Sequence, residues 1–116
     1  MPEELRDRTK AFALRVIRLY RSLPSAAEAQ VMEKQLLRCG TSVAANYRAA
    51  CRGRSRAEFA ARLGIVVEEA DESMLWLELL PDSGVIRHER LEPLLAEARE
   101  LTALFTASRH TTRKQS

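Results

Sequence analysis

Residues 55–80 read SRAEFAARLGIVVEEADESMLWLELL, and this stretch shows most clearly which kind of structure the chain forms. Its apolar residues recur with the 3.6-residue period of one face of an α-helix: Phe59, Leu63, Val66, Val67, Ala70, Met74, Leu77 and Leu80. Ser55 and Glu58 have the spacing of a capping box, in which hydroxyl and carboxylate each accept a bond from an unpaired N–H at the helix start. Pro81-Asp82-Ser83-Gly84 predicts the end of this helix.

Apolar residues with the same period also occur in the sequence before and after that helix. A first helix has its apolar stripe at Leu5, Phe12, Val16, Leu19, Tyr20 and Leu23, and we expect it to end before Pro24, which disfavours helical geometry in the preceding residue. A capping box at Ser25-Ala26-Ala27-Glu28 predicts the start of a second helix. Its stripe is Met32, Leu36, Cys39, Val43, Asn46/Tyr47 and Ala50. The small residues Gly40-Thr41-Ser42 would let another helix approach closely.

A last helix is expected from about Glu89 to Ser108, with Pro93 tolerated in its first turn. Its stripe is Leu94, Leu95, Ala98, Leu101, Leu104 and Phe105. Four helices with short connections predict an all-α, up-and-down antiparallel four-helix bundle. We expect a single domain over residues 1–109 and a polar, frayed tail over residues 110–116.

The composition supports this fold class and excludes others. The 116 residues are 46% hydrophobic, 30% charged and 5% aromatic, which is too apolar for a disordered chain and too poor in aromatics for a β-sandwich or barrel. No run approaches the roughly 20 apolar residues of a membrane span. The charged N-terminus does not resemble a secretory signal, so we expect a cytoplasmic protein that does not enter a membrane.

The sequence offers no clear catalytic or metal centre. Cys39 and Cys51 fall on one predicted helix, about 18 Å apart, and cannot form a disulfide with each other. His88 and His110 lack the Glu-x-x-His spacing of metal-binding bundles. Glu68 and Glu72 share a helix face and could hold a hard cation, but ion pairs with arginines of a neighbouring helix or subunit are favoured. We therefore expect no enzymatic activity, no cofactor and no metal.

Positive charge is concentrated in the first part of the chain. Residues 1–64 contain 13 basic and 6 acidic residues, a net charge of +7, whereas residues 65–116 contain 6 basic and 10 acidic residues, a net charge of −4. Sixteen of the 19 cations are arginine, whose planar fork suits phosphate oxygens. The basic half could bind a polyanion or the acidic half of another copy.

Two groups of arginines are the candidate nucleic-acid contacts. Arg48, Arg52, Arg54 and Arg56, with Arg62 further on, surround the turn between the second and third helices. On the first helix Arg8, Arg15 and Arg18 share a face. Tyr47 is the one nearby aromatic residue, so we expect phosphate contacts rather than base-specific recognition of RNA or DNA.

The third helix also carries apolar residues outside its main stripe. Ile65, Leu75, Trp76 and Leu79 predict a second partner for this helix, most simply another subunit. The acidic residues Glu68, Glu69, Asp71 and Glu72 could then pair with arginines of that subunit. In this alternative the protein is an interaction scaffold, and its arginines hold the oligomer together.

Ser42-Val43-Ala44-Ala45-Asn46, followed by Arg54-Ser55-Arg56-Ala57-Glu58-Phe59 and by Glu72, resembles a known bacterial family. The pattern is similar to that of the four-helix-bundle proteins encoded in intervening sequences of large-subunit ribosomal RNA genes, over about Phe12 to Phe105. This chain departs from the family pattern at Tyr47-Arg48-Ala49-Ala50, where Ile-Ala-Glu-Gly is usual. It departs again at Glu68-Glu69, where the family has a small-residue Gly-Ser stretch.

The resemblance implies a homopentameric ring without enzymatic activity. A similar pentameric bundle is the accessory protein of diversity-generating retroelements, where it binds the reverse transcriptase and nucleic acid. By that analogy, the partners to expect are further copies of the chain, RNA or DNA, and a nucleic-acid enzyme such as a reverse transcriptase.

Overall fold

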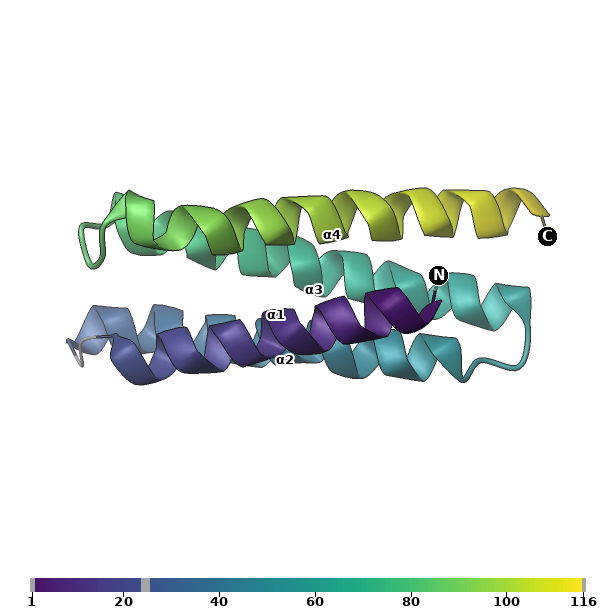
Figure 1. Ribbon diagram of the computed structural model, residues 1–116, viewed down its shortest axis with the longest axis horizontal. Helices are drawn as coiled ribbons and strands as arrows, with labels where there is room; N and C mark the ends of the chain where they lie inside the picture. Colours follow the sequence, from purple (N-terminus) through teal and green to yellow (C-terminus); the bar gives the residue numbers. More distant parts are fainter. Residues whose placement is uncertain (1, 24–25, 116) are drawn as a thin grey trace.

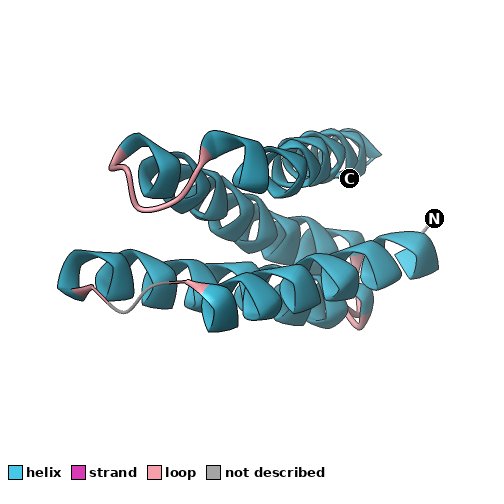
Figure 2. Cartoon of the chain, turned by 60° about the vertical axis from the view of Figure 1, so that its left-hand side comes forward, coloured by secondary structure: helices cyan, strands magenta, loops and turns pink. Residues whose placement is uncertain are grey.

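The computed structural model describes residues 2–23 and 26–115, which form four helices that run alternately up and down (Figure 1). These are α1 (Pro2–Ser22), α2 (Ala27–Cys51), α3 (Arg56–Asp82) and α4 (His88–Gln115). Figure 2 shows that all of the regular structure in this part of the chain is helical, with short connections. The predicted all-α four-helix fold is confirmed.

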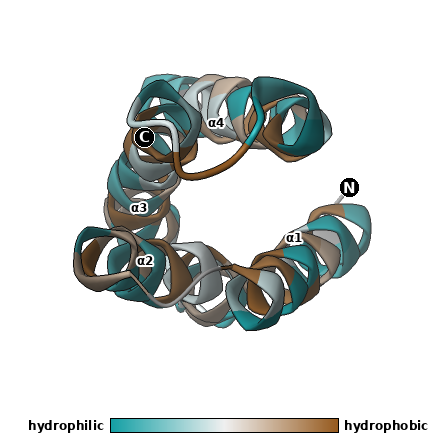
Figure 3. Ribbon diagram, turned by 90° about the vertical axis from the view of Figure 1, so that its left-hand side faces the viewer, coloured by the Kyte–Doolittle hydropathy of each residue, from teal (hydrophilic) through white to brown (hydrophobic). Residues whose placement is uncertain are grey.

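The core is made by the inward faces of all four helices. Figure 3 shows that the hydrophobic sides of the helices point toward the middle of the bundle. Fully buried side chains include Phe12 and Val16 of α1, Val43 and Tyr47 of α2, and Phe105 of α4. The predicted stripe of α4 is wrong at one position, because Leu104 is 36% exposed. Leu91 also lies in the core and was absent from the predicted stripe, although it precedes Leu94 and Leu95 by three and four residues.

The start of α3 follows the capping box predicted from the sequence. Ser55 is the N-cap, and its hydroxyl accepts a hydrogen bond from the backbone N–H of Glu58 at 3.1 Å. The Glu58 carboxylate reaches back to the backbone N–H of Arg54, also at 3.1 Å, which is one residue before the position in the usual box. Ser25 and Pro24, predicted to mark the α1–α2 junction, lie outside the described residues. The N-cap of α2 is Ala26, without a side-chain cap bond.

The end of α3 lies one residue beyond the proline that was expected to interrupt it. Pro81 is buried within the last turn, and the helix ends at Asp82. Gly84 then adopts a φ of 83°, a conformation that glycine accepts without steric cost. The N–H groups of Gly84 and Val85 donate to the carbonyls of Pro81 and Leu80, at 3.0 and 3.2 Å, which completes a Schellman motif.

The last helix is longer at both ends than the sequence predicted. It begins at His88, so Pro93 is its sixth residue and lies in the second turn rather than the first. It continues to Gln115, so the predicted helix end at Ser108 was wrong and most of the expected tail is helical. No Gly or Pro follows Ser108 to stop the helix, and Arg113 and Lys114 in the last turn favour a helix C-terminus electrostatically.

The α1–α2 pair approaches closely at Gly40, as its small neighbours suggested. An ideal Cβ on Gly40 would lie 2.9 Å from Cγ2 of Val16, so no larger side chain fits there without movement. By contrast, α1 and α4 contact each other less than any other pair of neighbouring helices does (Figure 3). None of the helices in residues 2–23 and 26–115 combines the length and hydropathy needed to cross a membrane.

Candidate nucleic-acid interface

The topology gathers basic residues at one end of the bundle. The start of α1, the α2–α3 turn and the end of α4 lie together at the end that also holds both chain termini (Figure 1). We call this the basic end. Its basic side chains lie in residues 2–10, 48–62 and 109–114: Arg6, Arg8, Lys10, Arg48, Arg52, Arg54, Arg56, Arg62, Arg109, Arg113 and Lys114. The same three segments carry four acidic residues, Glu3, Glu4, Asp7 and Glu58.

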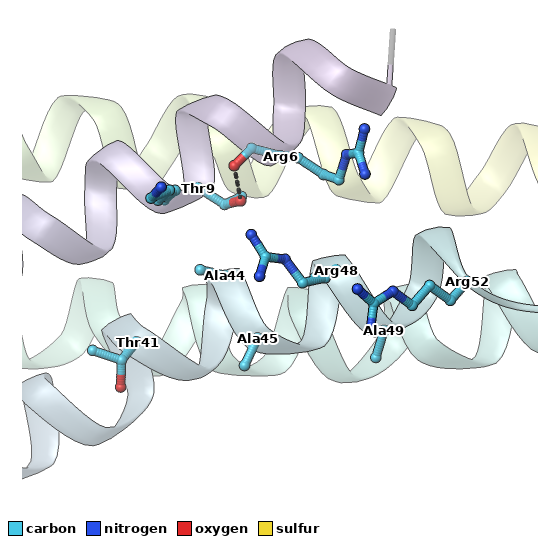
Figure 4. A pocket seen from close by; sticks show the side chains of 9 residues that line it. Arg6, Thr9, Thr41, Ala44, Ala45, Arg48, Ala49 and Arg52 are labelled. Carbon is cyan, nitrogen blue, oxygen red and sulfur yellow. Dashed lines mark hydrogen bonds between the residues drawn. The ribbon is translucent and has the colours of Figure 1, made fainter.

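The clearest candidate site at this end is a groove of about 460 Å³ between α1 and α2. Its base is made of small side chains, and its sides are basic (Figure 4). The small residues are Thr9, Thr41, Ala44, Ala45 and Ala49, and the basic residues are Arg6, Lys10, Arg48 and Arg52. We call it the α1/α2 groove. It exists because alanine at three positions of α2 leaves open the space that longer side chains would fill.

The four basic residues of the α1/α2 groove are available to an anion. No acidic residue lines the groove, and none of these four forms an ion pair within the described part of the chain. In Figure 4 the guanidinium of Arg48 extends from α2 toward α1, and that of Arg6 points along α1 toward its start. Unpaired cations around a small-residue base suit phosphate groups, each of which can accept several hydrogen bonds at once.

The structure divides the predicted four-arginine cluster between two hollows. Arg48 and Arg52 line the α1/α2 groove, whereas Arg54 and Arg56 line a second hollow of about 370 Å³ at the α2–α3 turn. Phe59 is half-buried in that second hollow, and Thr112 of α4 also lines it. Arg62 is exposed on α3 and lines neither hollow.

The predicted arginine face of α1 is also divided. Arg8 forms ion pairs with Glu97 and Glu100 of α4, at 2.7 and 3.1 Å, and the hydrogen bond that Arg8 donates to Glu97 is the largest cause of the raised pKa of Arg8. This guanidinium therefore joins α1 to α4. Arg15 and Arg18 lie further along α1, in a shallow hollow with Arg90. The α1 residues that reach the groove, Arg6 and Lys10, were missed, although their spacing of four residues places both on one helix face.

Two of the four acidic residues predicted at a subunit interface have a partner within the chain. Arg38 of α2 forms ion pairs with Glu69, at 3.2 Å from Nη1, and with Glu72. The indole N–H of Trp76 donates to the same Glu72 carboxylate at 3.1 Å. The bonds from Trp76 and Arg38 lower the pKa of Glu72. Arg38 did not appear among the sequence candidates, whereas Glu68 and Asp71 are exposed as an interface would require.

The remaining side chains at the basic end do not form a metal or base-stacking site. Tyr47 is buried against Phe105, with ring centroids 5.4 Å apart, so it cannot stack on a base. Burial raises the pKa of its hydroxyl. Both cysteines are free thiols. Within residues 2–23 and 26–115, no three His, Cys, Asp or Glu side chains are close enough to hold one metal ion.

Comparison with known proteins places the chain in a family. The sequence model for the 23S rRNA-intervening sequence protein family matches residues 4–107. The chain belongs to this family. A similar solved structure is a protein of unknown function from the S23 ribosomal protein family of Bacteroides thetaiotaomicron, with a TM-score of 0.82 and 38% sequence identity. The match covers 89% of this chain and 95% of that one. A search of curated proteins gave no match.

The motif residues shared with 23S rRNA-intervening sequence proteins have structural roles in this chain. The side-chain amide of Asn46 donates to the carbonyl of Ser42 at 2.9 Å, within α2. Ser55 and Glu58 cap α3, and Phe59 packs against the core. The groove arginine Arg48 and its neighbour Ala49 stand where this chain departs from the family pattern. The α1/α2 groove of this chain is therefore more basic than the pattern alone would predict.

Proposed function

We propose that this 23S rRNA-intervening sequence protein is a non-enzymatic, oligomeric four-helix bundle that binds structured RNA or DNA. The α1/α2 groove, with its four unpaired cations and no acidic lining residue, is the observation that carries the proposal. Arginine and lysine bind a nucleic acid by neutralising phosphates and releasing the counterions that surrounded them.

The contact we propose is to the phosphate backbone rather than to the bases. Arg48 and Arg52 offer planar forks to phosphate oxygens, while the nearby Tyr47 is buried in the core. Without stacking groups or a helix shaped to enter a groove of the duplex, such a surface distinguishes backbone shape more than sequence. A folded RNA or a duplex presents closely spaced phosphates to several cations at once.

The oligomer we propose is the homopentamer that the family resemblance implies. Ile65, Leu75 and Leu79 are 43%, 46% and 37% exposed on α3, and a neighbouring copy would cover them. The scaffold alternative differs in what the basic groove binds. In that alternative Arg48 and Arg52 pair with the exposed Glu68 and Asp71 of a neighbouring subunit, and no nucleic acid is bound.

The test is binding of a labelled RNA hairpin by the wild-type protein and by the double variant Arg48→Gln/Arg52→Gln, at about 50 and 200 mM salt. Each lost phosphate contact reduces the slope of log affinity against log salt by about 0.9. We expect the double variant to bind about 10–100-fold more weakly at the lower salt concentration, with a slope smaller by about 2 for each subunit that contacts the RNA.

The matched control is Arg21→Gln/Arg87→Gln, which removes two exposed arginines from the opposite end of the bundle. It has the same net charge as the groove variant and should bind like the wild type. Light scattering in the same buffers gives the mass of each assembly. Failure of the wild type to bind at 50 mM salt would refute the proposal. If the groove variant also dissociated into monomers, the scaffold alternative would be supported.

A further inference from the structure

A second groove lies on the other side of the basic end, between α3 and α4. It has a volume of about 340 Å³ and is lined by Ala57, Ala60 and Ala61 of α3 and by Arg109 and Arg113 of α4. We call it the α3/α4 groove. Like the α1/α2 groove it combines alanines on one helix with basic side chains, and none of its lining residues is acidic.

Arg109 is held in this groove in an unusual environment. Its guanidinium lies across Gly64 of α3, where an ideal Cβ would be only 3.2 Å from Cζ, Nε and Nη2. Its Nε is buried and has no hydrogen-bond partner among the described residues. The side chain is thus held in place by packing against α3, while the groove that it lines contains no acidic residue.

Arg113 adds a second cation on the same face of α4, one helical turn after Arg109. It is exposed and forms no ion pair within the described residues. Both arginines line the groove together with the three alanines of α3. The ligand chemistry that satisfies both is an oxyanion with several acceptor oxygens, as in a phosphodiester.

The hollow at the α2–α3 turn is lined by residues that adjoin residues of both grooves in sequence. Along α2, Ala49 lines the α1/α2 groove and the next residue, Ala50, lines the turn hollow. Along α4, Thr112 lines the turn hollow and the next residue, Arg113, lines the α3/α4 groove. The basic end thus carries three hollows, each lined by at least two arginines.

We propose that the α3/α4 groove is a second phosphate-binding site, in which Arg109 and Arg113 hold the backbone of the same nucleic acid that the α1/α2 groove contacts. This inference rests on the proposed function and extends it to the last two turns of α4. The bound RNA then crosses the basic end of the bundle, and its recognition depends on two phosphate clusters held at a fixed separation.

The experiment measures binding of the labelled RNA hairpin to two independent variants of the α3/α4 groove. Arg109→Gln/Arg113→Gln removes the cations. Ala61→Glu leaves them in place and introduces a carboxylate from the exposed α3 side of the groove, where it repels phosphate. Ala61→Gln is the control for side-chain size, and Arg21→Gln/Arg87→Gln is the control for net charge. Circular dichroism verifies that each variant is folded.

We expect both groove variants to bind the RNA about 10–100-fold more weakly than the wild type at 50 mM salt. For the arginine variant, the slope of log affinity against log salt should also be smaller by about 2 for each subunit that contacts the RNA. Both controls should bind like the wild type. If the two groove variants bind like their controls while Arg48→Gln/Arg52→Gln binds weakly, this inference is overturned and the proposed function stands. An effect of the arginine variant without an effect of Ala61→Glu would also overturn it. Absence of binding by the wild type would refute both proposals together.

Discussion

Glu33 is an acidic side chain that the structure places in the core of the bundle. It is 5% exposed, and its Oε1 has no hydrogen-bond partner among the described residues. It lies on the buried face of α2, between Ala29 and Leu36. Burial raises the pKa of this carboxyl above its ordinary value of 4.5, because the charged form loses its hydration.

We expect Glu33→Gln to stabilise the protein at neutral pH by about 1 kcal/mol, since it removes a mostly buried carboxylate whose Oε1 accepts no hydrogen bond from the described residues. The folded state binds the Glu33 proton more tightly than the unfolded state does. The free energy of unfolding of the wild type should therefore fall as the pH rises from 4.5 through the raised pKa. Urea unfolding of the wild type and of Glu33→Gln at pH 4 and pH 7 measures both effects. The increase in the free energy of unfolding that Glu33→Gln causes should be smaller at pH 4.

Glu78→Gln is the control for this substitution, because Glu78 is exposed on α3. It should change the free energy of unfolding little at either pH. If the gain from Glu33→Gln were the same at pH 4 and pH 7, ionisation of Glu33 would not be its cause.

Pair contacts such as Arg38 with Glu69 and Glu72 could not be predicted from the sequence. A charged residue on an amphipathic helix is expected to face solvent, and nothing in its neighbours along the chain shows which helix it will meet. The pairing depends on the register of α2 against α3. Ser55 and Glu58 were predictable because the capping box lies within four consecutive residues.

At the scale of helices, the sequence predicted which helices form, and in what order, better than it predicted the residues at which they end. The apolar period is a local property, and it correctly indicated the buried face at Phe12, Val16, Leu63 and Leu77. The α4 end was wrong because a polar segment without Gly or Pro can either fray or continue as a helix. The inclusion of Pro81 and Pro93 within helices shows that packing of the flanking buried residues outweighs the loss of one backbone bond each.

We expect Gly40→Ala to destabilise the protein, although alanine favours helices by about 1 kcal/mol over glycine. The new methyl group would meet Val16 at 2.9 Å, and the β-branched valine has few alternative rotamers. Overpacking of this kind costs about 1–3 kcal/mol, which exceeds the gain in helix propensity. Urea unfolding monitored by circular dichroism gives the difference in the free energy of unfolding between Gly40→Ala and the wild type.

Gly64→Ala is the matched comparison, because the atoms that its methyl group would meet belong to the flexible side chain of Arg109. We expect it to be neutral or slightly stabilising. In the Gly40→Ala background, Val16→Ala should cost less than it does in the wild type, since it relieves the overlap. Equal stability of the two single glycine variants would show that α1 can shift away from α2 without cost.

At the scale of the whole molecule, the fold brings together cations that are far apart in sequence. Arg6 and Lys10 of α1 meet Arg48 and Arg52 of α2, and Arg109 of α4 lies over the start of α3. The sequence indicated the arginines near the α2–α3 turn, because neighbouring members of the group are only two or four residues apart. It could not indicate the others, since their meeting depends on how four helices align. The α4 arginines also fell in or beside a segment expected to be an irregular tail.

The outer face of α3 leads to a prediction about assembly. Ile65, Leu75 and Leu79 are exposed, and Ile65 and Leu79 lie two heptads apart on one side of the helix. We expect the double variant Leu75→Lys/Leu79→Lys to dissociate the oligomer, because it places two cations in an interface that apolar contacts hold together. Light scattering should show a wild-type mass of about five times the 13.1 kDa chain, as the resemblance implies, and a variant near one chain mass.

Leu14→Lys/Val31→Lys is the matched control, because it replaces two exposed apolar residues on α1 and α2 with the same side chain. It should keep the wild-type mass, since neither residue lies on α3. Dissociation of the control but not of the α3 variant would place the subunit contact on the α1–α2 side, beside the α1/α2 groove. The groove would then be partly covered in the oligomer, and its arginines would serve subunit pairing instead of RNA. The mass measurement therefore tests the interface and, through it, whether the α1/α2 groove is open to a nucleic acid.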